Sequence, residues 1–244
     1  MTRTCALVGA AVGAGTTRLA VEMGATLART GRDVAVMDAA YETQGLGDYV
    51  DGRIGADVTE LVTEDVPLDS VVQPAGLDTP GRLSLCPARA PFERLARAKT
   101  AGAAEKLEKQ IAAVALSHDV VLVDTPPVAS NQAVAAVNAV DRVVAVTPDT
   151  ERGEDALARL TARMTDVGAS LDAVVGNFAA DAPVVTDADA RVPESEVGAP
   201  SACPAGLDGT APFAPAVVAA TETALDIDLA IEREESGRLD GLFG

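Results

Sequence analysis

The sequence of 244 residues predicts an α/β fold, a doubly wound and mostly parallel sheet flanked by helices. Short apolar runs, typical of parallel strands that are buried on both faces, recur along the chain. Stretches with helical periodicity separate these runs, as expected for repeated strand–helix units. Asp38, Asp124 and Asn177 stand at the carboxyl ends of three of the runs, where sheets of this kind bind ligands.

Each expected strand is a short apolar run bounded by polar or turn-forming residues. The runs at 5–8, 34–37 and 120–123 are continuously apolar and contain β-branched valines, which suits a fully covered strand. The predicted strands are residues 4–9, 34–37, 83–86, 120–123, 143–146 and 171–175, followed by a short strand that ends at 192–193.

The helices expected between these strands each have one apolar face. In the helix expected over residues 103–116, Leu107, Ile111 and Val114 recur at helical spacing, with charged residues on the opposite side. Gly31 follows the first helix in a position suited to a left-handed cap. The predicted helices are residues 17–30, 58–62, 103–116, 152–167 and about 215–235.

One domain is expected over residues 1–235, because a chain of this length buries a full core. Residues 179–215 are rich in Ala, Pro, Asp and Gly, so we predict loops around the last short strand. Residues 236–244 are predicted to form a flexible tail.

The charge balance is strongly acidic. The net charge is −18, from 19 basic and 37 acidic residues, and the only lysines are Lys99, Lys106 and Lys109. Such a composition resembles proteins of salt-loving archaea, although an ordinary acidic soluble protein is an open alternative. DNA binding is disfavoured, because a grip on phosphate backbone is built from lysine and arginine.

Nothing in the sequence marks export or a membrane span. No apolar run is long enough to cross a bilayer, and no basic region is followed by an apolar block and a cleavage site. Cys5, Cys86, Cys203 and the lone His118 have no metal-ligand spacing. We therefore expect a cytoplasmic protein with reduced cysteines.

A glycine-rich loop joins the first predicted strand to the first predicted helix. Gly13, Ala14 and Gly15 have no bulky side chains, so an anion can approach their backbone. Thr16 and Thr17 open the helix, and the Thr17 hydroxyl is placed to reach a magnesium ion. We predict a phosphate-binding loop here, with a tight turn that binds no ligand as the alternative.

Further motifs accompany this loop. Residues 118–127, His-Asp-Val-Val-Leu-Val-Asp-Thr-Pro-Pro, form the most specific one, and residues 27–46, 141–149, 174–177 and 192–195 carry others. With them the chain resembles the MinD/ParA family of deviant Walker P-loop ATPases, of the SIMIBI class, over nearly its whole length. Residues 118–127 are similar to the family's Walker B strand and switch II, and residues 38–46 to its switch I.

The resemblance implies the P-loop NTPase fold, binding of ATP or ADP with Mg²⁺, and a homodimer that the nucleotide controls. The nucleotide-binding residues it implies are Val12, Gly13, Ala14, Gly15, Thr16, Thr17, Arg18 and Asn177, and the metal-site residues are Thr17, Asp38 and Asp124. Asp124 would act on magnesium through water, and Asn177 would contact adenine. Capping roles for both aspartates and a turn role for Asn177 stay open.

Three positions depart from the family pattern. Aligned backward from the second strand, Ala11 takes the place of the signature lysine, and Thr16 that of the Walker lysine. Ala40 takes the place of the second switch I aspartate, which is associated with hydrolysis. An alignment anchored on Gly9 instead puts Gly15 at the lysine position, so the lysine is absent in both.

These departures weaken the expected nucleotide site. Each missing lysine removes a charge-assisted hydrogen bond, so the affinity for phosphate groups is expected to fall by about ten- to a hundredfold or more. Arg18 is the nearest cation in the sequence and would either substitute for lysine or lie solvated on the first helical turn. Backbone amides, the helix dipole and magnesium would remain.

The leading hypothesis is an ATP-binding positioning, partitioning or cell-division factor with weak or absent hydrolysis. The alternative is a pseudo-ATPase scaffold that binds an unknown protein partner without nucleotide, and an ATP-dependent ligase of the same fold is a third reading.

The tail residues Leu239, Leu242 and Phe243 resemble the membrane anchor of MinD proteins. Acidic neighbours outnumber basic ones there, so membrane anchoring is not expected.

Overall fold

The computed structural model describes residues 3–208 and 212–231. Its strands are β1 (Arg3–Gly9), β2 (Asp33–Asp38), β3 (Gln73–Pro74), β4 (Arg82–Cys86), β5 (Val120–Thr125), β6 (Arg142–Pro148), β7 (Ala173–Ala179) and β8 (Ala190–Pro193). Its α-helices are α1 (Thr16–Arg29), α2 (Val58–Thr63), α3 (Phe92–Ala98), α4 (Ala101–Val114), α5 (Asn131–Asn138), α6 (Glu151–Asp166) and α7 (Phe213–Leu225).

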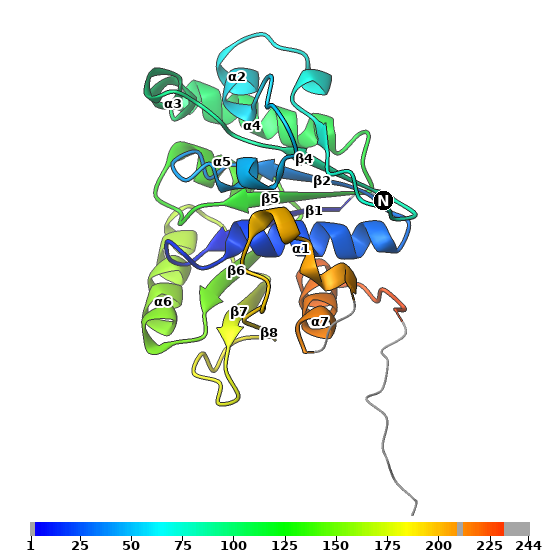
Figure 1. The fold of residues 1–244 in the computed structure, drawn as a ribbon. Coiled ribbons are helices and arrows are strands. Elements are labelled where there is room, and N and C mark those ends of the chain that lie inside the picture. Colours follow the sequence, from blue (N-terminus) through cyan, green and yellow to red (C-terminus); the bar gives the residue numbers. More distant parts are fainter. Residues whose placement is uncertain (1–2, 209–211, 232–244) are drawn as a thin grey trace, which may run out of the picture.

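The strands of the described residues form one sheet in the order β3-β4-β2-β5-β1-β6-β7-β8. All neighbouring pairs are parallel except β3 and β4, which are antiparallel. Figure 1 shows helices on both sides of this sheet. The predicted doubly wound α/β fold is therefore confirmed.

Two apolar cores lie on the two faces of the sheet. Alternation along β1 sends Cys5 and Leu7 to one face and Ala6 and Val8 to the other. The first face is covered mainly by α1 and α7, and the second by α2, α4, α5 and α6. Because both faces are covered, the central strands read as continuous apolar runs.

Some predicted boundaries need correction. The last helix was expected over residues 215–235, but α7 ends at Leu225 and is followed by Asp226 with a φ of 52°, a left-handed residue that stops a helix. Helices α3 and α5 were not predicted, since both are short and α3 buries only Ala98 among its side chains. Gly31, with a φ of 85°, has the predicted left-handed conformation. The predicted domain boundary at 235 and the tail 236–244 lie outside the described residues.

The sheet brings the polar strand ends together. Leu7 of β1 and Asp38 of β2 both lie in register with Asp124 of β5. The carboxyl ends of these parallel strands therefore meet at one edge of the sheet, on the left in Figure 1, where the glycine-rich loop also lies. No helix of the described residues is long and apolar enough to span a bilayer.

Candidate functional site

The glycine-rich loop, residues 10–15, connects β1 to α1. Gly13 and Gly15 have φ angles of 81° and 78°, a left-handed conformation that glycine adopts without steric cost. Gly15 is the N-cap of α1, and no side chain caps the helix. The first amides of α1 therefore face the loop, and together with the helix dipole they favour an anion.

The glycine-rich loop packs closely against the end of β7. The Nδ2 atom of Asn177 donates a hydrogen bond of 2.9 Å to the carbonyl oxygen of Ala14. A Cβ atom built on Gly15 would lie 2.4 Å from Asn177 Nδ2 and 2.8 Å from Phe178 Cζ, whereas one built on Gly13 would meet nothing within 4 Å. Gly15 thus satisfies both a conformational and a spatial requirement.

This difference between the two glycines predicts unequal effects of substitution. Gly13→Ala adds only left-handed strain of roughly 1–2 kcal/mol, which in a domain of this size lowers the melting temperature by about 2–8 °C. Gly15→Ala adds the same strain and must also displace Asn177 and Phe178, so we expect a clearly larger decrease. Thermal unfolding of both variants measures it, and equal decreases would contradict the packing described here.

Thr17 and Asp124 meet beside this loop. The Thr17 hydroxyl, in the first turn of α1, donates a hydrogen bond of 2.5 Å to Asp124 Oδ2 at the end of β5. Asp124 is buried, and burial raises the pKa of its carboxyl above the usual value, while the bond from Thr17 opposes that rise. A hydroxyl and a carboxylate, here in contact beside the glycine-rich loop, supply oxygen atoms, the kind of ligand that Mg²⁺ prefers.

Asp38 lies behind this pair and does not line the cavity described below. Its Oδ1 accepts a hydrogen bond of 2.8 Å from the Ala40 amide, and its Oδ2 accepts one of 3.3 Å from the Ala88 amide. Burial, and then the neighbouring charge of Asp124, raise the pKa of Asp38 well above its usual value. Asp38 thus organises the turn after β2, and its role toward a metal stays a prediction.

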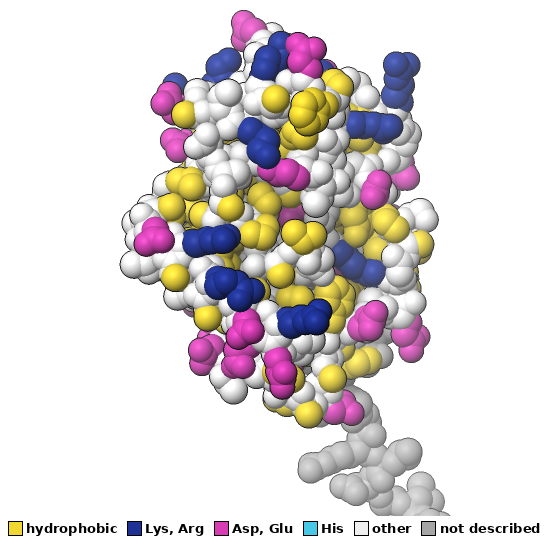
Figure 2. All heavy atoms as spheres, turned by 90° about the vertical axis from the view of Figure 1, so that its left-hand side faces the viewer, with side chains coloured by type: hydrophobic (Ala, Val, Ile, Leu, Met, Phe, Trp, Pro, Cys, Tyr) yellow, Lys and Arg dark blue, Asp and Glu magenta, His cyan; other side chains and the backbone are white. Residues whose placement is uncertain are grey.

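A cavity of about 580 Å³ opens beside Thr17 and Asp124. The loop forms one wall, and the turns after β2 and β5 form the others. Its lining includes the predicted residues Val12, Gly13, Ala14, Gly15, Thr16, Thr17, Arg18 and Asp124. Figure 2 views this end of the molecule, where Lys and Arg side chains lie among hydrophobic ones over the centre and most Asp and Glu side chains lie toward the rim.

The same cavity contains residues that the sequence did not reveal. Lys99, which follows α3, and Glu42, in the turn after β2, both line it and form an ion pair of 2.5 Å. Lys99 is far from the loop in sequence and belongs to no recognised spacing, so only the fold brings it to the site. Val12, at the tip of the loop, is 84% exposed.

A smaller cavity of about 220 Å³ adjoins the loop on its other side. Asn177, Phe178, Pro193 and Phe213 contribute to its lining, so Asn177 and the turn after β8 lie at the same cavity. The Asn177 amide nitrogen is engaged by the loop, which leaves its Oδ1 as the polar group able to face a ligand.

The Arg18 side chain lies along this smaller cavity. Its Nη1 donates to the Val197 carbonyl, its Nη2 donates to Ser195 Oγ at 3.0 Å, and Nη2 lies 3.4 Å from Glu22 Oε1. The guanidinium also lies 5.5 Å from the centroid of the Phe213 ring. For Arg18 to bind phosphate in place of the missing lysine, its side chain would have to leave these partners.

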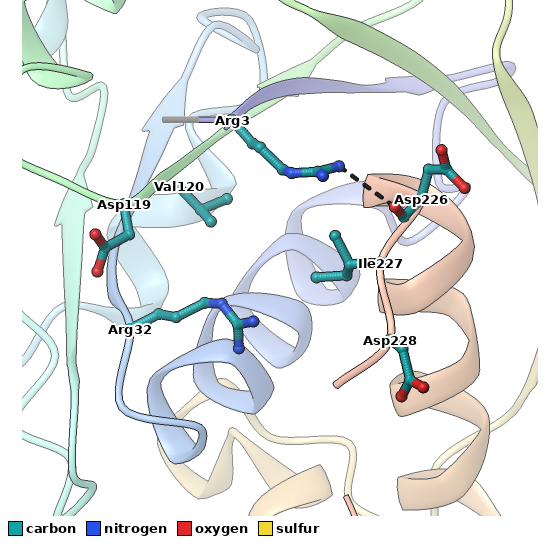
Figure 3. A pocket seen from close by; sticks show the side chains of 7 residues that line it. All are labelled: Arg3, Arg32, Asp119, Val120, Asp226, Ile227 and Asp228. Carbon is teal, nitrogen blue, oxygen red and sulfur yellow. Dashed lines mark hydrogen bonds between the residues drawn. The ribbon is translucent and has the colours of Figure 1, made fainter. Parts of the chain in front are cut away.

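A cavity at the opposite edge of the sheet is less suited to a ligand of this kind. It has a volume of about 580 Å³ and lies at the amino ends of β1 and β5. Figure 3 shows Arg3 and Arg32 there with Asp119, Asp226 and Asp228, and the hydrogen bond from Arg3 to the Asp226 carbonyl after α7. Arg3 also donates to the Leu225 carbonyl. These arginines are balanced by aspartates, so the cavity carries no net positive charge.

The described residues contain no group of three or more His, Cys, Asp and Glu side chains that could hold a metal ion on their own. Magnesium is commonly held by one or two protein ligands together with phosphates and water, so this finding does not conflict with Thr17 and Asp124 as ligands.

Comparison with known proteins gives the family. A family model described as an AAA domain matches residues 2–174 of the 244-residue chain. The chain belongs to this AAA-domain family. A search of curated protein sequences found no significant match for it.

Solved structures similar to this AAA-domain protein share its fold. The septum site-determining protein MinD with Mg-ADP from Pyrococcus horikoshii OT3 has a TM-score of 0.77 and 18% identity, covering 91% of this chain and 95% of that one. A McdA variant from Cyanothece with ATP has a TM-score of 0.75 and 17% identity, covering 95% and 99%. The MinC:MinD complex from Aquifex aeolicus has a TM-score of 0.75 and 20% identity, covering 95% and 99%. The resemblance to the MinD/ParA ATPases and their P-loop fold is therefore confirmed.

Proposed function

We propose that this AAA-domain protein binds ATP or ADP with Mg²⁺ and acts as a MinD/ParA-type positioning, partitioning or cell-division factor. The observation that carries the proposal is the Thr17–Asp124 contact beside a cavity walled by the glycine-rich loop. In this proposal the bound nucleotide controls formation of a homodimer and association with a protein partner. The solved relatives bound to Mg-ADP, to ATP and to the partner MinC support it by analogy.

The residues present fit the proposed nucleotide and metal. Amides from Gly13 to Thr17 would hold the phosphates, and the Thr17 hydroxyl with Asp124 would hold Mg²⁺. Asn177 would contact the base from the smaller cavity. The two buried carboxylates Asp38 and Asp124 also fit a cation, because their neighbouring charges repel one another until a positive ion arrives.

Hydrolysis is proposed to be weak or absent. Phosphoryl transfer depends almost entirely on positioning and on stabilisation of charge in the transition state. In this chain Ala11, Thr16 and Ala40 occupy the positions at which the family places two lysines and the second switch I aspartate. Magnesium, backbone amides and the helix dipole would then support binding better than turnover.

Titration of the protein with ATP and with ADP, each with and without Mg²⁺, tests this proposal. We expect saturable binding at micromolar to millimolar nucleotide, tighter with Mg²⁺, together with a rise in melting temperature and little phosphate release. Potassium chloride at molar concentration should be included as a second condition, because the acidic surface repels itself at low salt. Absence of any thermal shift or heat of binding in both conditions would contradict the proposal.

A protein-binding scaffold without nucleotide is the second candidate. The loss of both lysines and of the switch I aspartate favours it, because these are the side chains that the family uses to bind and hydrolyse the nucleotide. The same titration separates the two functions, because a scaffold would show no saturable response to ATP while still forming its protein complex.

A further inference from the structure

The larger cavity holds a lysine that comes from outside the glycine-rich loop. Lys99 follows α3, and its carbonyl oxygen accepts a hydrogen bond of 3.0 Å from Asn131 Nδ2 at the start of α5. This bond ties the Lys99 backbone to the start of α5, the helix that follows β5 and its Asp124. The Lys99 side chain lines the same cavity as Thr17 and Asp124.

The ion-pair partner of Lys99 is the carboxylate of Glu42, which lines the same cavity. Glu42 Oε1 lies 2.5 Å from Lys99 Nζ, and the Glu42 carboxylate also accepts hydrogen bonds of 3.3 and 3.4 Å from Gln132 Nε2. Gln132 is fully buried, so it holds Glu42 in place. The side chains of Lys99 and Glu42 are 37% and 40% exposed, and ion pairs this accessible to water are weak.

A polyphosphate would compete with Glu42 for this lysine. Its charge exceeds that of one carboxylate, and a lysine binds phosphate as a mobile point charge on a flexible stem. Arg18, the other cation that lines this cavity among the described residues, is already bonded to Glu22, Ser195 and Val197. Within the part of the chain that the structure describes, the Lys99 side chain has Glu42 as its one ion-pair partner and no such set of anchors.

We propose that Lys99 is the phosphate-binding cation of this site, taking the place of the lysines that the loop lacks. Glu42 is its counter-ion in the nucleotide-free state and releases it when phosphates enter. This inference rests on the proposed nucleotide binding and adds to it the residue that recognises the terminal phosphates. It also predicts that affinity rises with the number of phosphates.

The test compares the affinities of ATP, ADP and AMP, with Mg²⁺, for matched variants. Lys99→Met is paired with Lys106→Met, which removes the same charge from an exposed position on α4. We expect Lys99→Met to weaken ATP binding by about ten- to a hundredfold, to affect AMP much less, and to leave the melting temperature unchanged. Lys106→Met should bind ATP as the natural protein does. Lys99→Arg, which keeps the positive charge, should retain most of the ATP affinity that Lys99→Met loses.

Glu42→Gln provides a second variant with the opposite expected sign. Removing the competing carboxylate should tighten ATP binding several-fold, while Glu64→Gln, at an exposed ion pair with Arg97, should not change it. Equal ATP affinities of Lys99→Met and Lys106→Met, or equal losses for ATP and AMP, would overturn the role of Lys99 alone. Absence of ATP binding by the natural protein would instead overturn the proposed function on which it rests.

Discussion

Replacing Glu22 with alanine is expected to lower the melting temperature by about 6–20 °C. The Glu22 side chain is fully buried on α1, where Oε1 accepts a hydrogen bond of 2.9 Å from the Ala205 amide and Oε2 accepts one of 2.8 Å from the Gly206 amide. It also pairs with Arg18. Removing one partner of a buried pair costs about 3–5 kcal/mol, which converts at 2–4 °C per kcal/mol for a domain of this size.

The controls for this prediction separate the buried contacts from the loss of a charge. Glu22→Gln keeps one acceptor and should lose only part of the stability. Glu105→Ala, at an exposed position on α4, should leave the melting temperature nearly unchanged. A Glu22→Ala variant that melts within 2 °C of the natural protein would show that the turn at residues 205–208 does not depend on this carboxylate.

Asp124→Asn is expected to affect ligand binding and stability in opposite directions. The asparagine cannot supply a negative charge to Mg²⁺, so ATP affinity in magnesium should fall by about ten- to a hundredfold. The same change removes the repulsion between Asp124 and Asp38, so the ligand-free protein should melt at a higher temperature at neutral pH. Calorimetric titration and thermal unfolding of the same preparations measure both effects.

The pH dependence of this stability has a definite sign. Burial of both carboxyls, and for Asp38 also the charge of Asp124, raise the pKa of each above its value in the unfolded chain. Between about pH 4, where a free aspartate titrates, and these raised values, the folded state binds more protons than the unfolded state. The free energy of unfolding from this pair therefore decreases as pH rises through the folded pKa values.

This decrease should be smaller in Asp124→Asn and should persist in Glu108→Gln, which removes an exposed acidic charge from α4. Addition of Mg²⁺ and nucleotide should also reduce it in the natural protein, because the cation favours the deprotonated forms. An unchanged pH profile in Asp124→Asn would mean that other groups set the dependence.

The sheet was predictable because burial on both faces leaves a direct trace in the sequence. Parallel strands such as β2 and β5 are continuous apolar runs that end at an aspartate, and the fold places these ends side by side. The extent of α7 was not predictable, because the apolar pattern continues through Ile227 and Leu229 while Asp226 turns the chain away. Helix α3 escaped prediction because its mostly exposed side chains give no apolar periodicity.

The candidate site was predictable only where its residues are close in sequence to the loop or to a strand end. Thr17, Asp124 and Asn177 fall in this class, and the structure brings all three to the loop. Lys99 and Glu22 were not identified, for different reasons. Lys99 reaches the cavity only because the fold places the end of α3 beside the start of α5, where Asn131 bonds to the Lys99 carbonyl. Glu22 has the appearance of a surface charge on a helix until residues 205–208 fold over it.

If the proposed nucleotide site is correct, the attachment of the loop to β7 has a consequence for altering which base the site accepts. Asn177 bonds to the Ala14 carbonyl while its neighbour Phe178 lies against Gly15, so one dipeptide shapes the boundary between the two cavities. Remodelling this dipeptide to suit a different nucleobase would also reshape the loop backbone that is proposed to face the phosphates. Base preference and phosphate affinity are therefore expected to vary together in libraries randomised at 177–178, and to be separable only by changes at 193–195.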